Sequence, residues 1–376
     1  MAGIYIHIPF CRKKCTYCDF HFSTTFENYR ERMVDAIVKE AYSRASELSE
    51  ETVKTIYFGG GTPSVLNADE LPQILRIFRE NYAVDENVEI TLEANPDDIK
   101  IELLKVWRRE GVNRLSIGVQ SFRSEDLDWM NRSHTAEQSL NAVKLAQQEG
   151  FDNITIDLIY GLPNMSMTGW EAQLDKAIGL NVRHISAYCL TVEPNTALAH
   201  LTKTGKIVTP GDQVQSEEFL MLRRKLLEAG YVQYEVSNFG KEGFESQHNS
   251  SYWKNENYLG VGPSAHSFDG ASRRWNVSNN QRYMSALETE DDYFEVETLS
   301  PTDKFNELLL TGLRTVYGVD KTVLLKEVSP PASFEAQINE YKGKGWLVEE
   351  HDKYLLTPEG LLFADQIASE LFLLED

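Results

Sequence analysis

The chain has 376 residues, of which 41% are hydrophobic and 11% aromatic, and its 58 acidic and 37 basic side chains give a net charge of −21. This length predicts two or three domains, or one large barrel with an appendage, and the composition excludes disordered, collagen-like and coiled-coil chains. The acidic balance argues against nucleic-acid binding, and the lack of an 18-residue apolar run or a signal-peptide pattern predicts a cytoplasmic protein without an integral membrane segment.

Apolar runs rich in β-branched residues alternate with stretches of helical periodicity along the first half of the chain. Alternation of this kind favours a parallel sheet in an α/β fold. We expect the sheet to curve into a partial or complete (β/α) barrel over residues 1–238, with an open doubly wound sheet as the alternative. The predicted strands are residues 4–8, 53–58, 88–93, 114–120, 154–160 and 184–190, and the predicted helices are residues 27–45, 71–82, 101–110, 136–149 and 170–180.

Three of the four cysteines, Cys11, Cys15 and Cys18, lie together just after the first predicted strand. Such a group in a reducing compartment indicates a shared metal rather than a disulfide framework. With His21 the three thiols could form a structural zinc site. Alternatively, they could hold an iron–sulfur cluster in which one iron lacks a protein ligand. The fourth cysteine, Cys189, is expected to be a small buried side chain rather than a further ligand.

Glycines or polar residues follow each predicted strand, where (β/α) barrels place their chemistry. The glycines at 59–61 would let a ligand approach the backbone closely, although a tight turn would also need them. Glu93, Gln120 and Asp157 could bind an ammonium group or ribose hydroxyls, or could instead cap the following helices. Arg132 could pair with a ligand carboxylate or be a solvated surface charge. Six strands that end in this way indicate a cofactor site, which favours the cluster over zinc.

The last third of the chain changes in pattern. Residues 239–300 are rich in Gly, Ser and Asn and predict a loop-rich bridge. Residues 301–376 predict helices followed by a two-stranded wing, which suggests a winged-helix-like domain, but their 14 acidic and 7 basic side chains argue against DNA binding. We expect this domain to cover the open side of the barrel or to meet a partner protein. Its predicted helices are residues 303–315, 333–344 and one from about 358, and its predicted strands are residues 345–350 and 353–357, joined by a turn at 351–352.

The spacing Cys11-x3-Cys15-x2-Cys18, with Tyr17 inside it, resembles the signature of radical S-adenosylmethionine (SAM) proteins. Residues 5–11 (YIHIPFC) resemble the oxygen-independent coproporphyrinogen III oxidase branch of that superfamily. The resemblance implies a [4Fe-4S] cluster on the three cysteines, an electron donor that reduces it, and SAM bound at its open iron. Carried over by position, the residues implied to line the SAM pocket are Tyr5, Gly60, Gly61, Thr62, Glu93, Gln120, Arg132 and Asp157.

Within that branch the sequence is more similar to heme chaperones than to dehydrogenases. Two residues after Cys18, where the dehydrogenases resemble a pattern with a fourth cysteine, this sequence has Phe20. The sequence also starts only ten residues before Cys11, without the N-terminal extension typical of the dehydrogenases. Residues 248–253 (HNSSYW) match an HNxxYW motif associated with heme binding in such chaperones. The resemblance implies a chaperone that binds heme and passes it to acceptor hemoproteins, which could be membrane-bound respiratory proteins. The alternative is an enzyme that uses SAM to decarboxylate coproporphyrinogen III oxidatively.

His248 is the best candidate for the heme ligand. A neutral imidazole is a normal axial ligand, and Tyr252 and Trp253 offer flat apolar surface to a porphyrin. The alternative is that these side chains pack a loop and that His248 makes one hydrogen bond. His266 is a second candidate.

Overall fold

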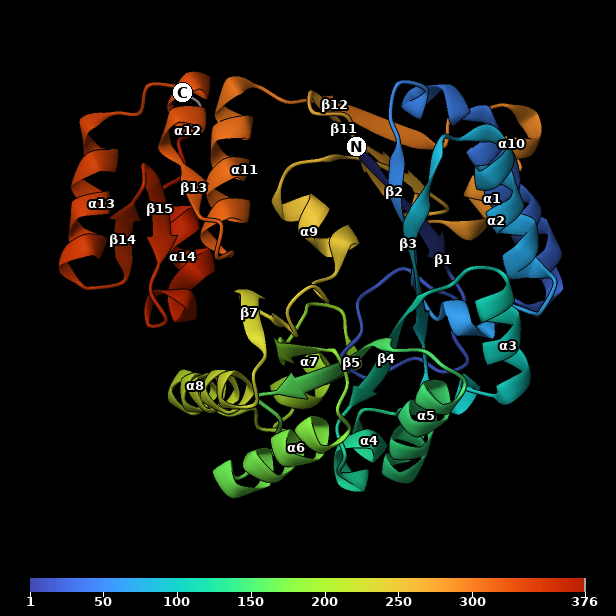
Figure 1. The fold of residues 1–376 in the computed structure, drawn as a ribbon, viewed down its shortest axis with the longest axis horizontal. Helices are drawn as coiled ribbons and strands as arrows, with labels where there is room; N and C mark the ends of the chain where they lie inside the picture. Colours follow the sequence, from blue (N-terminus) through green and yellow to red (C-terminus); the bar gives the residue numbers. More distant parts are fainter. Residues whose placement is uncertain (375–376) are drawn as a thin grey trace.

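The computed structural model describes residues 1–374 and is built around a parallel sheet of six strands, β1 to β6, in sequence order (Figure 1). Neighbouring strands pair in parallel register, for example Tyr5 with Tyr57 and Asp157 with Ser186. The strands are β1 (Ala2–Ile8), β2 (Val53–Gly60), β3 (Val84–Ala94), β4 (Arg114–Gln120), β5 (Asn153–Tyr160) and β6 (His184–Cys189). The six predicted strands are thus confirmed.

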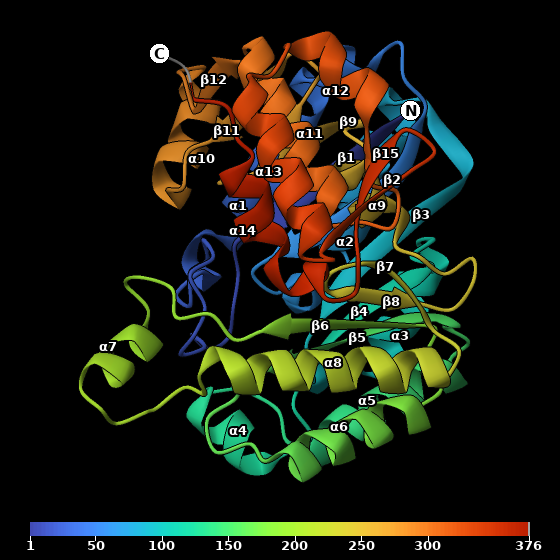
Figure 2. The same cartoon turned by 90° about the vertical axis from the view of Figure 1, so that its left-hand side faces the viewer.

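Helices connect these strands and pack on one side of the sheet (Figures 1 and 2). Residues 27–45, predicted as one helix, form a 3₁₀ turn (Glu27–Tyr29), α1 and the start of a second 3₁₀ turn (Ala45–Leu48). The other four predicted helices are confirmed to within three residues at each end. The connecting helices are α1 (Arg30–Ser43), α2 (Glu70–Asn81), α3 (Ile101–Arg109), α4 (Ser124–Trp129), α5 (Ala136–Gln148) and α6 (Met167–Gly179).

The sheet does not close, which confirms a partial barrel within an α/β fold. Beyond β6, the strand β8 (Asn238–Gly240) and then β7 (Val232–Glu235) pair antiparallel. Beyond β1, the strand β9 (Asn257–Val261) pairs in parallel and leads to three further antiparallel strands. These are β10 (His266–Phe268), β11 (Ser272–Asn276) and β12 (Phe294–Thr298), so that β7 and β12 form the two edges of the sheet.

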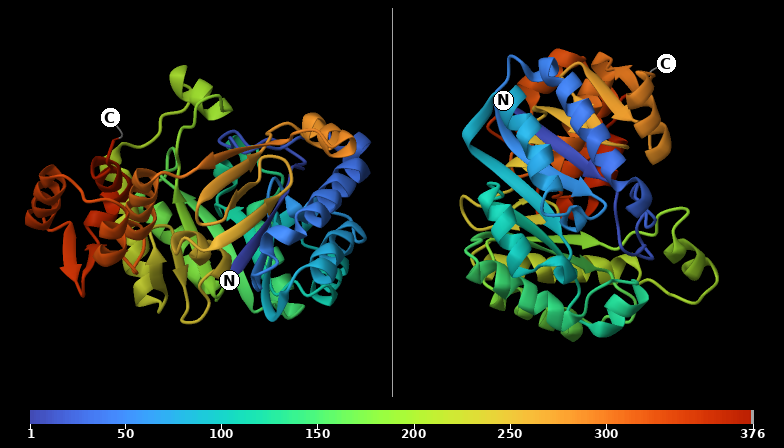
Figure 3. Two further views of the ribbon diagram at one scale, coloured as in Figure 1. Left: turned by 90° about the horizontal axis from the view of Figure 1, so that it is seen from above. Right: turned by 90° about the vertical axis from the view of Figure 1, so that its right-hand side faces the viewer.

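The expectation of a loop-rich bridge over residues 239–300 is wrong. This stretch completes β8, supplies β9 to β12, and contains α9 (Gln247–Trp253) and α10 (Asn280–Thr289). In Figure 3 its strands continue the sheet beyond the N-terminal strand. The strands are three to five residues long, and pairing with distant segments, rather than local periodicity, stabilises them. The sequence analysis did not predict α4, nor the two helices directly before this stretch, α7 (Ala197–Lys203) and α8 (Asp212–Glu228). The division of the chain into three domains stays a prediction.

Alternation along the strands places apolar and polar side chains on opposite faces of the sheet. In β1, Ile4, Ile6 and Ile8 are fully buried in the hydrophobic core that includes residues of α1 and α2. Tyr5 and His7 point to the other face, which the curvature of the sheet turns inward. Figure 1 shows α9 alone on this concave side of β1 to β3. The interior of the barrel is therefore polar.

The C-terminal part has a separate hydrophobic core, which includes Phe305, Phe334 and Ile338. The predicted turn is confirmed at His351 and Asp352, which both have positive φ (51° and 60°), as a two-residue hairpin turn requires. The winged-helix assignment stays a prediction. The elements are α11 (Pro301–Leu313), β13 (Val319–Asp320), α12 (Lys321–Glu327), α13 (Ala332–Gly343), β14 (Leu347–Glu350), β15 (Lys353–Leu356), a 3₁₀ turn (Gly360–Phe363) and α14 (Ala364–Glu370).

This C-terminal part lies against the open side of the sheet (Figure 1). The Val236 amide donates to the Arg314 carbonyl (3.0 Å), and Thr315 forms an antiparallel bridge to Glu235. The Asn255 amide group, just after α9, donates to the Thr311 hydroxyl (3.4 Å) on α11. Among residues 1–374, no helix combines the length and the apolar character needed to cross a membrane.

Candidate functional site

A cavity of about 600 Å³ opens beside the cysteine loop and extends along the polar inner face of the barrel. All three clustered cysteines line it, as do the ends of β2 to β6 and one residue of α9, Asn249. The cavity therefore joins the two sequence features that were predicted separately, the cysteine motif and the heme motif. The predicted SAM-pocket residues that line it are Gly60, Gly61, Thr62, Glu93, Gln120, Arg132 and Asp157.

The cysteine loop is held at its base and at its tip by backbone hydrogen bonds. At the base, the Cys11 amide donates to the Ser23 carbonyl (3.1 Å). At the tip, the Thr16 amide donates to the Met130 carbonyl (3.1 Å) and the Leu198 amide of α7 donates to the Thr16 carbonyl (2.8 Å). In Figure 2, α7 projects from the body of the molecule beside this loop. These contacts attach the loop to β1, to the end of α4 and to α7 through the protein's own backbone.

The thiols are free and only partly exposed. Burial raises the pKa of Cys11 to about 12 and that of Cys18 to about 11, and neighbouring thiols add to both shifts. An Arg132 guanidinium nitrogen lies 3.4 Å from the Cys15 sulfur. Bound metal would deprotonate such thiols, and its positive charge would offset the repulsion between the resulting thiolates. The donor set of three partly buried thiols beside a cation fits a thiolate-bound metal group.

Among residues 1–374, no three His, Cys, Asp or Glu side chains converge closely enough to hold a single metal ion. His21, the fourth ligand of the zinc alternative, does not line the cavity. Its Nε2 is 2.7 Å from the Asn280 side-chain oxygen instead. Thiols that surround one cavity without meeting at one point fit a polynuclear cluster better than a Cys₃His zinc ion.

The glycine turn after β2 is required by packing as well as by access to the cavity. A Cβ on Gly61 would lie 2.7 Å from the carbonyl oxygens of Ile8 and Phe10, and a Cβ on Gly60 would lie 2.6 Å from the His7 ring. Gly60 also has φ of +102°, which favours glycine. The Thr62 amide donates to the Phe10 carbonyl (2.7 Å), so the turn is fastened to the start of the cysteine loop.

Two partly buried carboxyl groups, those of Glu93 and Asp157, face the cavity. Burial raises the pKa of Glu93 to about 7 and that of Asp157 to about 6, and the charge of Asp157 contributes to the Glu93 shift. The Tyr57 hydroxyl donates to Glu93 (2.7 Å), and the Ser116 hydroxyl donates to Asp157 (3.2 Å). Each carboxyl retains acceptor capacity for hydroxyl or ammonium groups of a ligand.

Gln120 and Arg132 line the cavity near the cysteine loop. Gln120 has φ of +65°, an unusual conformation for a residue other than glycine, and such strain is concentrated at functional sites. Arg132 is not a solvated surface charge. Its Nη2 donates to the Asn95 side chain (2.7 Å) and to the Gly118 carbonyl (2.9 Å), while its Nε is buried with no hydrogen-bond partner within residues 1–374.

Tyr5 belongs to the predicted SAM pocket but does not line the cavity. Its ring stacks on Tyr57 (6.1 Å between centroids), and its hydroxyl is 3.3 Å from His7 Nδ1. A Cβ on Gly59 would lie 2.9 Å from the Tyr5 ring. Tyr5 therefore supports the wall of the cavity from behind.

His248 lies at the floor of the barrel with both ring nitrogens in hydrogen-bond contact. Nδ1 is 2.8 Å from the Thr55 hydroxyl and Nε2 is 2.8 Å from the Tyr252 hydroxyl. The ring stacks on Tyr57 (4.9 Å), and only 1% of the residue is exposed. Burial, with a smaller contribution from Arg114, lowers the pKa of His248 to about 3, so the ring is neutral. Binding to iron would require one of these nitrogens to leave its partner.

His266, the second heme candidate, is exposed, and its ring stacks on Trp275 (6.3 Å between centroids). It does not line the cavity.

Several residues that the sequence analysis did not select also line the cavity. Ser116, Arg114 and Thr155 come from the inward face of β4 and β5, and Asn249 comes from α9. Cys189 lines it too, and burial raises the pKa of its thiol to about 11. Polar residues at every second position of predicted strands were the available signal, since such a pattern marks a polar face.

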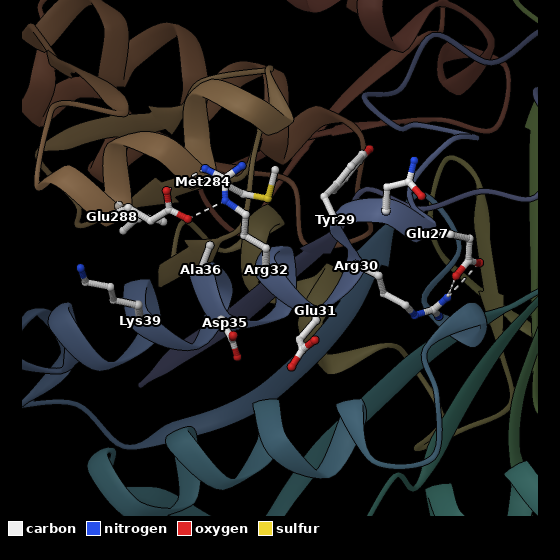
Figure 4. A pocket seen from close by; sticks show the side chains of 12 residues that line it. Glu27, Tyr29, Arg30, Glu31, Arg32, Asp35, Ala36, Lys39, Met284 and Glu288 are labelled. Atoms are coloured by element: carbon white, nitrogen blue, oxygen red, sulfur yellow. Dashed lines mark hydrogen bonds and ion pairs between the residues drawn. The ribbon is translucent and has the colours of Figure 1, made fainter.

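A second hollow of about 500 Å³ lies between α1 and α10, away from the cysteines. Figure 4 shows its charged lining, in which Arg32 pairs with Glu288 and Arg30 with Glu27. These basic side chains already have acidic partners and the groove holds no thiol, so it offers no comparable chemistry.

The sequence model of the radical SAM superfamily matches residues 5–176. The chain is 32% identical to a heme chaperone HemW of Bacillus subtilis, and the alignment covers 98% of each chain. It is 35% identical to a heme chaperone HemW of Lactococcus lactis, and this alignment covers 99% of the chain and 97% of the relative.

A solved structure of coproporphyrinogen III oxidase (HemN) from Escherichia coli, a radical SAM enzyme, superimposes with a TM-score of 0.84. The superposition covers 99% of this chain and 90% of that one, at 23% sequence identity. The likeness confirms the fold.

Proposed function

Because this chain belongs to the radical SAM superfamily, and within it to the family of the HemW heme chaperones that it matches over nearly its whole length, we propose that it binds heme and delivers it to acceptor hemoproteins. The observation that carries the proposal is this full-length likeness, together with the HNxxYW motif at residues 248–253. The acceptors and the donor of electrons to the cluster are further proteins that the function requires. The three free cysteines that would hold a cluster fit a reducing compartment, and we therefore propose that the protein acts in the cytoplasm.

A radical SAM domain implies a [4Fe-4S] cluster and SAM. Cys11, Cys15 and Cys18 would hold the cluster, which supplies a reducing electron and an open iron site when bound. Gly60 to Thr62 would offer backbone groups to the methionyl end of SAM. Glu93 and Asp157 would accept hydrogen bonds from its ammonium or ribose groups, and Arg132 would pair with its carboxylate.

His248 would be the heme ligand, with Tyr252 and Trp253 against the porphyrin. For this role the imidazole has to exchange its contact with Thr55 or Tyr252 for iron. Tyr252 lies on α9 together with His248, whereas Thr55 lies on β2, so loss of the Thr55 contact is the exchange that would move α9 outward, and we propose that this exchange accompanies heme binding. Phe20, which lines the cavity and is 69% exposed, adds an apolar side chain at the mouth.

The test is a titration of hemin into the anaerobically reconstituted protein, into His248→Ala and into His266→Ala, followed by the Soret band. We expect saturation near one heme per chain in the wild type and in His266→Ala, and a lost or shifted band in His248→Ala. Equal, saturable binding in all three would contradict His248 as the ligand. Weak, non-saturating absorbance changes in all three would contradict heme binding itself.

The alternative function is SAM-dependent oxidative decarboxylation of coproporphyrinogen III. The chain shares its fold with the E. coli oxidase, so this activity has to be tested directly. Reconstituted protein should be incubated with coproporphyrinogen III, SAM and a reductant. We expect no protoporphyrinogen, and clear SAM-dependent formation of that product would overturn the chaperone proposal.

A further inference from the structure

The helix α9 contributes neighbouring residues to two different environments. Asn249 lines the cavity beside the cysteine loop, whereas His248, one residue earlier, is bound to Thr55 and Tyr252 in the floor of the barrel. The Asn249 backbone amide donates to the Ser246 hydroxyl (3.3 Å). Its side-chain amide forms no hydrogen bond to any residue within 1–374, so a donor and an acceptor remain free for a ligand in the cavity.

A buried cation lies in the same part of the cavity. Arg114 is 1% exposed and lines the cavity; one of its Nη nitrogens donates to the Thr155 hydroxyl, and its Nε has no hydrogen-bond partner among the described residues. The Arg114 guanidinium lies 4.0 Å from Glu89. The Glu89 carboxylate in turn accepts the backbone N–H of His248 (3.2 Å). A chain of contacts therefore links Arg114, which lines the cavity, through Glu89 to the backbone of His248.

We propose that Asn249 binds the small polar ligand of the cysteine cavity and that α9 thereby couples the two sites, so that a filled cavity holds His248 in the barrel and opposes its binding to heme. This inference rests on the proposed function, with SAM as the ligand of the cavity and His248 as the ligand of heme iron. It adds Asn249 to the residues that bind SAM, and it states that SAM and heme weaken each other's binding.

The coupling follows from the short distance along the chain between the two residues. His248 and Asn249 lie on the same helical turn, which Ser246 caps and which Trp253 fastens to Arg314 (5.4 Å) at the other end. A movement that carries the His248 ring out of the barrel also withdraws the Asn249 amide from the cavity. Each ligand therefore favours a different position of α9, and by linkage each must weaken the other by the same factor.

The first experiment measures hemin affinity in the reconstituted protein, without SAM and with saturating S-adenosylhomocysteine, a SAM analogue that cannot be reductively cleaved in the same way. We expect the analogue to weaken hemin binding about tenfold, within the usual range of such couplings. Equal hemin affinity in both conditions would overturn the coupling and leave the chaperone proposal intact.

The second experiment compares Asn249→Ala with Gln247→Ala, a control on the same helix whose side chain is exposed and does not line the cavity. Calorimetry should show about tenfold weaker binding of the analogue to Asn249→Ala and unchanged binding to Gln247→Ala. Hydrogen exchange of the α9 amides should slow when the analogue binds the wild type but not when it is added to Asn249→Ala. Equal affinities for the two variants, or unchanged exchange in the wild type, would overturn the inference even if heme binding itself failed.

Discussion

At the residue scale, burial shifts the pKa values of several titratable groups in and beside the cavity away from their ordinary values. Glu93 and Asp157 are raised to about 7 and about 6, and their ionised forms are the ones that accept hydrogen bonds from ribose or ammonium groups. His248, lowered to about 3, stays neutral and keeps a lone pair for a donor or for a metal. Protonation states at this site are thus set by the fold.

The raised carboxyl pKa values predict that SAM binding depends on pH. A carboxyl group is protonated below its pKa, so acceptor strength is lost as the pH falls through about 7 and then about 6. We expect affinity for S-adenosylhomocysteine to be constant near pH 8 and to drop about tenfold by pH 5.5, where both groups are largely neutral. Calorimetry across this range should give a shallower drop for Asp157→Asn. Affinity that rises on acidification would contradict this role of the two carboxylates.

The cysteines give a second prediction at this scale. Replacement of Cys11, Cys15 or Cys18 by Ser should abolish the broad visible absorption of the reconstituted protein, because three thiolates are the least that hold a [4Fe-4S] cluster here. Cys189→Ser, in the same cavity, is the matched control and should keep about four irons per chain. Loss of the absorption in Cys189→Ser would show that the cluster has a fourth cysteine ligand. Metal analysis and absorption spectra supply both readouts.

At the scale of the elements, a buried ionic network attaches the late strands to the first helix. Glu40 of α1 accepts from Arg44 (2.9 Å), from the Asn276 side chain (2.8 Å) and from the Gly262 amide (2.8 Å). Arg44 also donates to the Gly260 carbonyl (2.8 Å). Figure 3 shows α1 beside α10 on this side of the molecule. The network compensates for the short length of β9 to β11.

Glu40→Ala should destabilise the protein by about 1 to 3 kcal/mol, because it leaves the buried Asn276 side chain and Gly262 amide without their acceptor, while Arg44 keeps its ion pair with Glu47 (2.7 Å). The control is Glu27→Ala, which removes an exposed pair with Arg30 and should change stability by less than about 1 kcal/mol. Urea unfolding of the two variants under anaerobic conditions measures the difference. Equal midpoints would mean that the network adds nothing to the attachment of these strands.

At the scale of the whole molecule, the open side of the barrel is where the heme motif and the C-terminal part meet. The Arg314 guanidinium lies over the Trp253 ring (5.4 Å), and Lys254 lies over Tyr317 (5.1 Å). The C-terminal part therefore holds α9 in place from outside, while Thr55 and Glu89 hold it from inside. Release of His248 requires both sets of contacts to loosen.

Arg314→Ala should loosen α9 without touching the cavity. We expect amide exchange in residues 248–253 to become about tenfold faster, since a partly buried cation–π contact contributes about 1 to 2 kcal/mol. Arg224→Ala, which removes an exposed pair with Glu228 on α8, is the control and should leave this exchange unchanged. Mass-spectrometric hydrogen exchange resolves the segment. Unchanged exchange in Arg314→Ala would contradict the outer anchor.

The sequence by itself determined the parallel core, the cysteine triplet and seven of the eight predicted SAM residues that the structure places at the cavity. Strands β1 to β6 were predicted because continuous β-branched runs bounded by helices are local signals. The glycine turn at 60–61 and the cysteine triplet were predictable because their residues are neighbours along the chain, so that a local pattern reveals them. Glu93, Gln120 and Asp157 were found because parallel strands bring their ends to one edge.

Only the tertiary structure decided what depends on contacts between distant segments. Residues 239–300 have a loop-like composition, yet they form strands because β1 and β6 offer them edges to pair with. Tyr5 is on the predicted strand, but the ring of Tyr57 separates it from the cavity. Arg132 is partly buried and bound within the protein, rather than a free surface charge, because Asn95 and Gly118 accept from it. His248 has no free ring nitrogen because Thr55 and Tyr252 meet it from opposite sides. Burial and hydrogen-bond partners are properties of three-dimensional packing, and no local pattern in the chain specifies them.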